Sequence, residues 1–241
     1  MERLASLIAF ALGSIGWLTP ARASVYVLSG GDIGEGYSPG RIVEYAYYAT
    51  QPAHSQSTYT IQNVPFQPFN WVFQDRSTTH GNVNITNAFA FAAGTTAIGA
   101  SADDLALRDA MGQDFLYTAT PPNPNHAPWT LTLGGLTPGT VYQLDLFWHT
   151  IFTNPTTYTS TGANGPFVDT VPGLAGKYYD VRNNVIANSL GQISVVATNN
   201  TTDPDAPYLT AFSITSVPEP SALLLLGAGG LWLWWQRRSS R

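Results

Sequence analysis

The spacing of apolar residues between residues 24 and 216 constrains this fold most. No long stretch there repeats apolar residues every 3.6 positions, as an amphipathic helix requires. Short runs rich in Val, Ile, Thr and aromatic residues alternate with Gly, Pro, Asn and Thr breaks instead. These runs predict strands at Val25–Leu28, Ile42–Ala49, Thr58–Val64, Trp71–Phe73, Val83–Phe91, Phe115–Thr118, Trp129–Leu133, Val141–His149, Phe167–Val171, Tyr178–Val181, Ile193–Thr198 and Tyr208–Thr215.

One short helix is expected, with Ser101 as its N-cap, Asp103 and Asp104 in its first turn, and Gly112 after its end. The segment Asn154–Pro166 is expected to be a loop. A dozen strands with one short helix and no repeat period predict a mainly β fold, an antiparallel β-sandwich of jelly-roll type. Because the runs are evenly spread, we expect residues 24–216 to form one domain.

The N-terminus is typical of a secretory signal peptide. Arg3 is followed by an apolar stretch from Leu4 to Leu18 that is short for a membrane span, and then by Ala21-Arg22-Ala23. This basic, apolar, small-x-small order predicts cleavage by signal peptidase after Ala23, which makes residues 1–23 the signal.

The C-terminus predicts a second addressing signal. Val217-Pro218-Glu219-Pro220-Ser221 leads into an uncharged stretch, 222–235, which is followed by Arg237, Arg238 and Arg241. Fourteen helical residues rise about 21 Å, less than the roughly 30 Å hydrocarbon core, so the span is a marginal anchor. The arginines act as a stop-transfer cluster on the cytoplasmic side, and the prolines keep the preceding link extended.

Taken together, residues 217–241 resemble the PEP-CTERM sorting signal: a Pro-Glu-Pro motif, a short apolar helix and an Arg cluster. The resemblance implies recognition by an exosortase, a membrane peptidase-transpeptidase of Gram-negative bacteria that make exopolysaccharide. It also implies transient residence in the inner membrane, followed by delivery to the cell surface or extracellular matrix. It assigns no catalytic residue to this chain.

A Leu136-Thr137-Pro138-Gly139 corner precedes Tyr142, whose hydroxyl is expected to fold back onto the corner backbone while its ring packs inward. Alternation then places Leu144, Leu146 and Trp148 on the face of Tyr142, with Gln143, Asp145 and Phe147 opposite. The corner is similar to those of fibronectin type III domains and of galactose-binding-like sandwiches. The length of the body favours the second resemblance, which implies a fold and no particular ligand.

Composition excludes several function classes. Cysteine is absent, which removes disulfides, thiol nucleophiles and Cys-based metal sites. Residues 24–216 hold five basic and thirteen acidic side chains, so their formal charge is −8. An acidic body without a basic stripe excludes nucleic acid as a partner.

The residues suited to chemistry are scattered. The acid pairs are Asp103-Asp104, explained as helix N-terminal charge, Asp32 and Glu35 in a Gly-rich loop, and Asp203 and Asp205 in a polar loop. The last pair is a Ca²⁺ candidate, with an ordinary turn as the competing interpretation, and no other cofactor is expected. His54, His80, His126 and His149 form no metal-ligand spacing.

The rings available to stack on sugars are Tyr45, Tyr47, Tyr48, Trp71, Trp129 and Trp148, although most aromatic residues are expected in the core. The sequence therefore predicts an exported, non-enzymatic structural or adhesive protein with exopolysaccharide as its expected partner. Two alternatives stay open: a carbohydrate-binding module and a secreted glycoside hydrolase. Coplanar exposed rings would favour the first alternative, and paired acids in a groove the second.

Overall fold

The structure of the protein is a computed structural model, which describes residues 24–28, 42–50, 57–61, 64–70, 77–92, 114–117, 128–150, 155–172, 177–199 and 209–216. These residues form strands, turns and short connections, and no helix occurs among them. The predicted helix at 101–112 and both terminal segments lie outside the described residues. Within the described part of the chain, no helix is long and apolar enough to cross a membrane.

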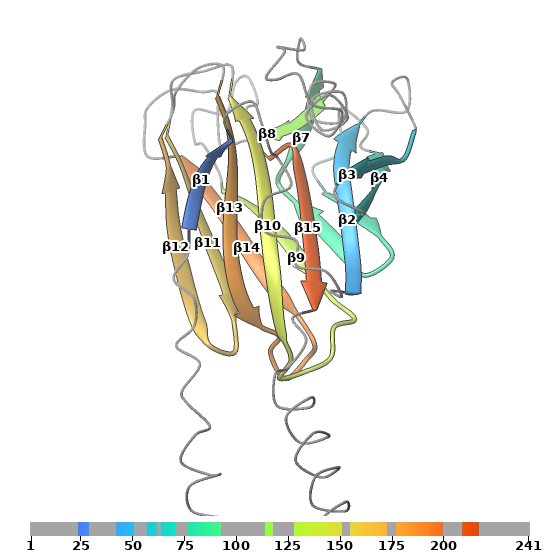
Figure 1. Ribbon diagram of the computed structural model, residues 1–241, viewed down its shortest axis with the longest axis vertical. Helices are drawn as coiled ribbons and strands as arrows, with labels where there is room; N and C mark the ends of the chain where they lie inside the picture. Colours follow the sequence, from blue (N-terminus) through green and yellow to red (C-terminus); the bar gives the residue numbers. More distant parts are fainter. Residues whose placement is uncertain are drawn as a thin grey trace, which may run out of the picture.

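Two main sheets face each other (Figure 1). The first has seven strands, in the order β1 (Ser24–Leu28), β13 (Lys177–Ile186), β10 (Val141–Thr150), β15 (Ala211–Ser216), β2 (Ile42–Thr50), β4 (Val64–Asn70) and β3 (Tyr59–Ile61). The second has six strands, in the order β12 (Gly165–Val171), β11 (Thr156–Gly162), β14 (Ile193–Asn199), β9 (Trp129–Leu133), β6 (Val83–Thr86) and β5 (Ser77–His80). A separate pair consists of β7 (Phe89–Ala92) and β8 (Asp114–Tyr117).

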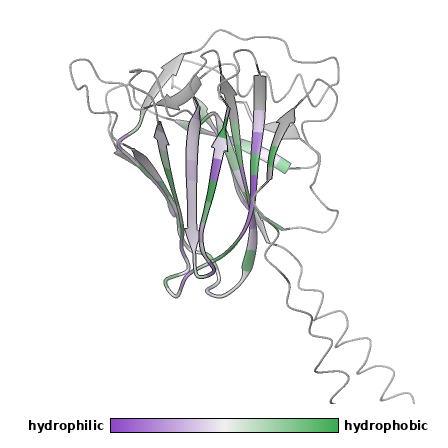
Figure 2. Ribbon diagram, turned by 90° about the vertical axis from the view of Figure 1, so that its left-hand side faces the viewer, coloured by the Kyte–Doolittle hydropathy of each residue, from purple (hydrophilic) through white to green (hydrophobic). Residues whose placement is uncertain are grey.

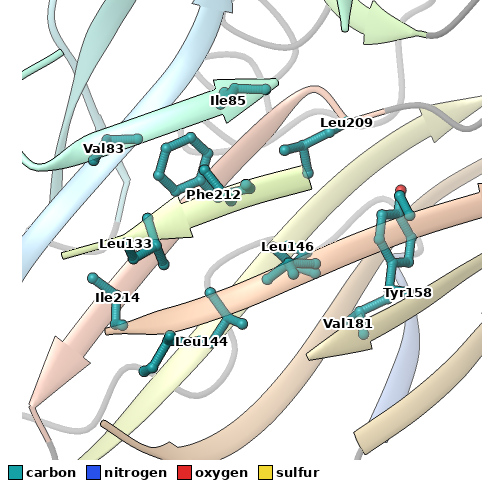
Figure 3. Close-up of a cluster of buried hydrophobic side chains, with 14 of the residues drawn as sticks. Val83, Ile85, Leu133, Leu144, Leu146, Tyr158, Val181, Leu209, Phe212 and Ile214 are labelled. Atoms are coloured by element: carbon teal, nitrogen blue, oxygen red, sulfur yellow. The ribbon is translucent and has the colours of Figure 1, made fainter. Parts of the chain in front are cut away.

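The core lies between the two sheets. Figure 3 shows Val83, Ile85 and Leu133 of the six-stranded sheet packed with residues of the seven-stranded sheet, all of them buried. The partners from the seven-stranded sheet are Leu144, Leu146, Val181, Phe212 and Ile214. Burying one face of each sheet against the other is the stable arrangement for strands of alternating polarity. The predicted fold class, a mainly β antiparallel sandwich, is confirmed.

The strand pairs are antiparallel except β2 and β4, which pair in parallel from Tyr47 opposite Gln67 to Thr50 opposite Asn70. The run predicted as one strand over Thr58–Val64 contains β3 and only the first residue of β4, so the rest of β4 was not predicted. The run predicted over Val83–Phe91 is also interrupted, because Asn87 adopts a φ of 60°. Asn is among the few residues that tolerate this left-handed conformation, so it ends β6 before β7 begins.

The segment Asn154–Pro166 is not a loop, and that prediction is wrong. It contains β11, which forms a hairpin with β12 and pairs with β14 on its other side. Its inward residues are Thr156, Tyr158 and Ser160, all buried. Two of these three are polar, which removes the alternation of apolar and polar residues by which a half-buried strand is recognised in a sequence.

The Tyr142 corner is confirmed. The backbone N–H of Thr137 donates to the Tyr142 hydroxyl at 3.0 Å, and the Tyr142 ring is buried in the core. Leu144 and Leu146 lie on the same face of β10 in the core cluster, as the alternation predicts. The side chain of Trp148 lies outside the described residues.

Candidate functional site

The outer face of the six-stranded sheet is an array of hydroxyl-bearing side chains. One row across the sheet joins Thr159, Val196, Thr130 and Thr86, and the next joins Thr161, Ser194, Thr132, Asn84 and Thr79. A shorter row joins Thr170, Thr157 and Thr198. We call these residues, with Pro166 and Val168 at the β12 edge, the threonine face.

The dimensions of this face follow from the strand geometry. Neighbouring strands lie about 4.8 Å apart, and every second residue along a strand is about 6.8 Å from the last, so hydroxyls repeat on a regular grid. The side chains on the grid are half-buried or exposed, and none is charged. In Figure 2, pale or purple segments alternate with green ones along the strands, as expected for strands with one polar and one apolar side.

Some of these groups bond to one another. Asn84 Nδ2 donates to Thr79 Oγ1 at 2.7 Å, and the hydroxyls of Thr157 and Thr170 lie 3.0 Å apart. Because a hydroxyl is both donor and acceptor, a face of this kind offers both functions to a ligand at regular intervals, together with Thr methyl groups.

The candidate sugar-stacking rings differ in their exposure to solvent. Trp129 and Tyr48 are fully buried, which contradicts a surface role for them. Tyr45 and Tyr47 are half-buried beside the core, with ring centroids 6.3 Å apart and an interplanar angle of 20°. The ring centroids of Tyr47 and the exposed His80 lie 5.3 Å apart in a T-shaped arrangement, and the Tyr45 hydroxyl donates to the Gly134 carbonyl at 2.6 Å. Trp71 and the Trp148 side chain lie outside the described residues.

A buried charge cluster lies on the opposite side of the molecule, on the outer face of the seven-stranded sheet. Arg182 on β13 donates from Nε to Asp145 Oδ1 and from Nη2 to Asp180 Oδ2, both at 2.6 Å. Gln143 Nε2 also donates to the Asp145 carboxylate, at 2.8 and 3.0 Å. The side chains of Asp145 and Asp180 are 0% and 1% exposed, and that of Arg182 is 16% exposed.

The two carboxylates of this cluster are not equivalent. Asp180 Oδ1 has no hydrogen-bond partner in the part of the chain that the structure describes. Burial, and then the nearby charge of Asp145, raise the pKa of Asp180 well above its usual range, against the opposing effect of Arg182. Glycosidases use a pair of carboxyl groups, but these two are buried, and a substrate needs access.

The remaining predicted site residues lie outside the described residues. They are Asp32, Glu35, Asp103, Asp104, the calcium candidates Asp203 and Asp205, His54, His126, Ala21, Ala23, Val217, Pro218, Glu219, Pro220, Ser221, Arg237, Arg238 and Arg241. His149 lies in β10, and its side chain is not described. Among the described residues, no group of three or more His, Cys, Asp or Glu side chains is placed to hold a metal ion.

Sequence reasoning did not single out the threonine face or the charge cluster. Both carried a local signal: Thr-x-Thr spacing in the two strands β9 and β11, and Asp180-x-Arg182 beside Gln143-x-Asp145. These spacings place the residues on one face of each strand. They do not tell which strands are neighbours.

The fold and the position of its last strand define a β-sandwich that runs directly into a sorting signal. The chain carries a PEP-CTERM protein-sorting motif at residues 216–238. The match begins at Ser216, which is the last residue of β15 and is paired with Tyr142 and Ile42. The motif indicates exosortase-dependent export and a surface or extracellular location in a Gram-negative bacterium.

The solved structures that resemble this chain do so at low identity. A calcium binding mutant of Bacteroides uniformis β-glucuronidase 2 is 12% identical, over 72% of this chain and 18% of that one, with a TM-score of 0.47. The ANXUR1 extracellular domain from Arabidopsis thaliana is 9% identical, over 72% of this chain and 48% of that one, with a TM-score of 0.44. A family 35 carbohydrate-binding module from Clostridium thermocellum is 11% identical, over 67% of this chain and 98% of that one, with a TM-score of 0.35.

This chain therefore spans less than a fifth of the β-glucuronidase. No curated protein sequence matches it. The TM-scores all lie below 0.5, so the assignment of the fold rests on the two sheets themselves.

Proposed function

We propose that this is a non-enzymatic structural or adhesive protein of the cell surface or extracellular matrix, sorted by an exosortase, which contacts neutral exopolysaccharide through its threonine face. The observation that carries the adhesive role is the register of the six-stranded sheet, which aligns hydroxyl side chains into rows across β11, β14, β9 and β6.

Chemistry supports a neutral polysaccharide as the ligand. Sugar hydroxyls are donors and acceptors, as are those of the threonine face, and an uncharged face neither attracts nor repels a neutral polymer over a distance. One hydrogen bond to such a ligand contributes only about 1 kcal/mol net. A long polymer that engages many positions gains affinity through multivalency, without any single deep pocket.

A structural role for the buried acids supports the absence of enzymatic activity. Asp145 and Asp180 are both hydrogen-bonded to Arg182 and are almost completely buried, so they stabilise the junction of β10 and β13 and are not presented to a substrate. Purified protein is then expected to release no reducing sugar from a polysaccharide that it binds.

The sorting part of the proposal divides the chain into residues 1–23 as signal peptide, 24–216 as one β-sandwich domain and 217–241 as sorting signal. Signal peptidase removes the first part. The span 222–235 then resides transiently in the inner membrane, with Arg237 and Arg238 on the cytoplasmic side, until the exosortase cuts near Pro218-Glu219-Pro220. Mass spectrometry of the surface protein should find no peptide from residues 232–241. Recovery of those residues in a cell with an exosortase would indicate a plain tail anchor.

The adhesive part is tested by removing hydroxyls at constant shape. In the Thr130→Val, Thr132→Val, Thr159→Val triple variant, binding to cellulose and to cross-linked dextran should fall, because three central grid positions lose their donors. Thr137→Val at the exposed corner is the matched control and should bind like the wild type. If the triple variant binds both polymers as well as the control, the threonine face is not the contact surface.

The Tyr45 and Tyr47 pair favours a second candidate, a carbohydrate-binding module that stacks a sugar on parallel rings. A Tyr47→Leu variant keeps apolar volume beside the core and removes the ring. A glycan array that loses its signal with Tyr47→Leu, and keeps it with the triple Thr variant, would favour this candidate over the threonine face.

A further inference from the structure

One end of the sandwich gathers the strand ends and turns nearest to the sorting motif. In Figure 1 it is the lower end, where β15 terminates and β2 begins. It comprises Ile42, Ser216 and the turns at residues 81–82, 134–140, 163–164 and 187–192. None of these residues is charged.

Exposed apolar side chains concentrate at this end. Among the described residues, the large hydrophobic side chains that are exposed are Ile42 (66%), Leu190 (75%) and Val168 (63%). Ile42 is paired with Ser216, and Leu190 lies at the tip of the turn between β13 and β14. Only Val168 lies elsewhere, on β12.

The turns at this end bond to one another through their backbones. Leu136 N–H donates to Gly191 O at 3.0 Å, Gly139 N–H to Ala187 O at 3.0 Å, and Gly134 N–H to Asn82 O at 2.8 Å. Gly191 has a φ of 67°, and a Cβ there would overlap the Leu136 carbonyl oxygen. Since these polar groups are already paired, moving them out of bulk water costs little.

The chain between this end and the apolar span is short. Five residues separate Ser216 from Ala222. Even fully extended, they hold the span within about 20 Å of the end of β15. Whenever residues 222–235 are in the membrane, the lower end therefore faces the bilayer surface at close range.

We propose that the lower end of the sandwich docks on the lipid bilayer surface while the sorting signal is membrane-bound, with Ile42 and Leu190 entering the headgroup region. The inference rests on the membrane stage of the proposed function. An uncharged end with two apolar tips and internally paired turns fits a lipid interface, where apolar side chains gain by insertion and unpaired backbone groups are costly. Docking holds the Pro218-Glu219-Pro220 link at the membrane surface.

The absence of cysteine permits a direct test with the full chain. Ile42→Cys, Leu190→Cys and, as the matched exposed apolar control, Val168→Cys each receive one fluorescent label and are reconstituted in phosphatidylcholine vesicles. Quenching by spin-labelled lipid is then measured. Labels at 42 and 190 should be quenched at least about twofold more than the label at 168, because insertion reaches only about 5–10 Å.

Two other outcomes would contradict the proposal in different ways. If the chain floats with the vesicles and all three labels are quenched equally, docking is wrong and the sorting function is unaffected. If the chain does not float with vesicles at all, the membrane stage fails together with docking. Urea unfolding of each labelled variant confirms that the sandwich is intact.

Discussion

In the six-stranded sheet, burial alternates along the central strands β9 and β14, so one side packs in the core and the other is half-exposed. In the seven-stranded sheet, the central strands β10 and β15 are buried on both sides: residues 142–147 and 211–215 are all buried. The outward-facing polar side chains at the centres of the two sheets thus lie in opposite environments.

The consequence is a difference in how polar groups are satisfied. Thr130 and Thr132 on the six-stranded sheet are half-buried and accessible to water. Gln143 and Asp145 on the seven-stranded sheet are buried and take their partners from within the protein, with Arg182 as the cation. Polar groups of the first kind are available for binding, whereas those of the second kind contribute to stability only as a connected set.

The largest effect is expected for Arg182→Met. The change removes the only cation bonded to Asp145 and Asp180 within the described residues and leaves two buried carboxylates side by side. Breaking a buried ion pair in this way costs about 3–5 kcal/mol of unfolding free energy. Urea denaturation measures it. If Arg182→Met lowers the unfolding free energy no more than a substitution on the threonine face does, the polar groups of the two sheets do not differ in their contribution to stability.

Replacing Asp145 and replacing Asp180 should lower the unfolding free energy by different amounts. Asp145→Asn is expected to cost about 3 kcal/mol, because it removes the charge that accepts from both Arg182 and Gln143. Asp180→Asn should cost less than about 1.5 kcal/mol at pH 7, because one oxygen of Asp180 has no partner among the described residues and burial already disfavours its charge. Urea midpoints at pH 7 compare the variants, and equal losses would contradict the asymmetry.

The unfolding free energy should also depend on pH through the buried Asp180 carboxyl, and the sign of this dependence can be worked out. The pKa of Asp180 is higher in the folded than in the unfolded chain, so the folded state holds its proton more tightly. Stability therefore falls as the pH rises from about 4, where an unfolded Asp ionises, towards the raised pKa of the folded state. Burial also raises the pKa of Asp169, so Asp180→Asn should reduce this fall and not abolish it. Unfolding free energies at pH 4–8 test this, and a fall as steep in the variant as in the wild type would contradict it.

A smaller loss of unfolding free energy is expected when the Tyr142 hydroxyl, on the core side of the seven-stranded sheet, is removed. Tyr142→Phe keeps the buried ring and removes the acceptor of the Thr137 N–H, so it should cost about 1 kcal/mol. Tyr142→Ala, which also removes the ring, should cost roughly 3 kcal/mol or more. Thermal unfolding of both variants separates the hydrogen bond from the packing, and an unchanged melting temperature for Tyr142→Ala would show that the corner does not hold β10.

The smallest change in unfolding free energy is expected for a substitution on the threonine face. Thr132→Val should change the unfolding free energy by less than about 0.5 kcal/mol, because water solvates its hydroxyl in both states and Val suits a strand equally well. Thermal denaturation is the measurement. A loss above 1 kcal/mol would mean that the hydroxyl rows stabilise the sheet and are not reserved for a ligand.

The parts of the fold that were predictable are those with a strong local pattern. Trp129–Leu133 alternates apolar and polar residues and was predicted with its observed bounds. The strands Ser77–His80 and Thr156–Gly162 were missed, because their inward positions include polar residues or too few apolar ones to reveal a period of two. Tyr142 was placed correctly, since its corner depends on residues only five positions away.

The sequence by itself determined the C-terminal sorting motif, the alternation that makes strands and the Tyr142 corner, because each is encoded within a few consecutive residues. Only the tertiary structure decided that Thr159, Val196 and Thr130 share a row, that Arg182 reaches Asp145, and that Ile42 and Leu190 share one end of the sandwich. These depend on which strands are neighbours and in what register. Register is set by burial and turns across the whole sandwich, and a slip of one residue would turn every threonine of a strand to the opposite face.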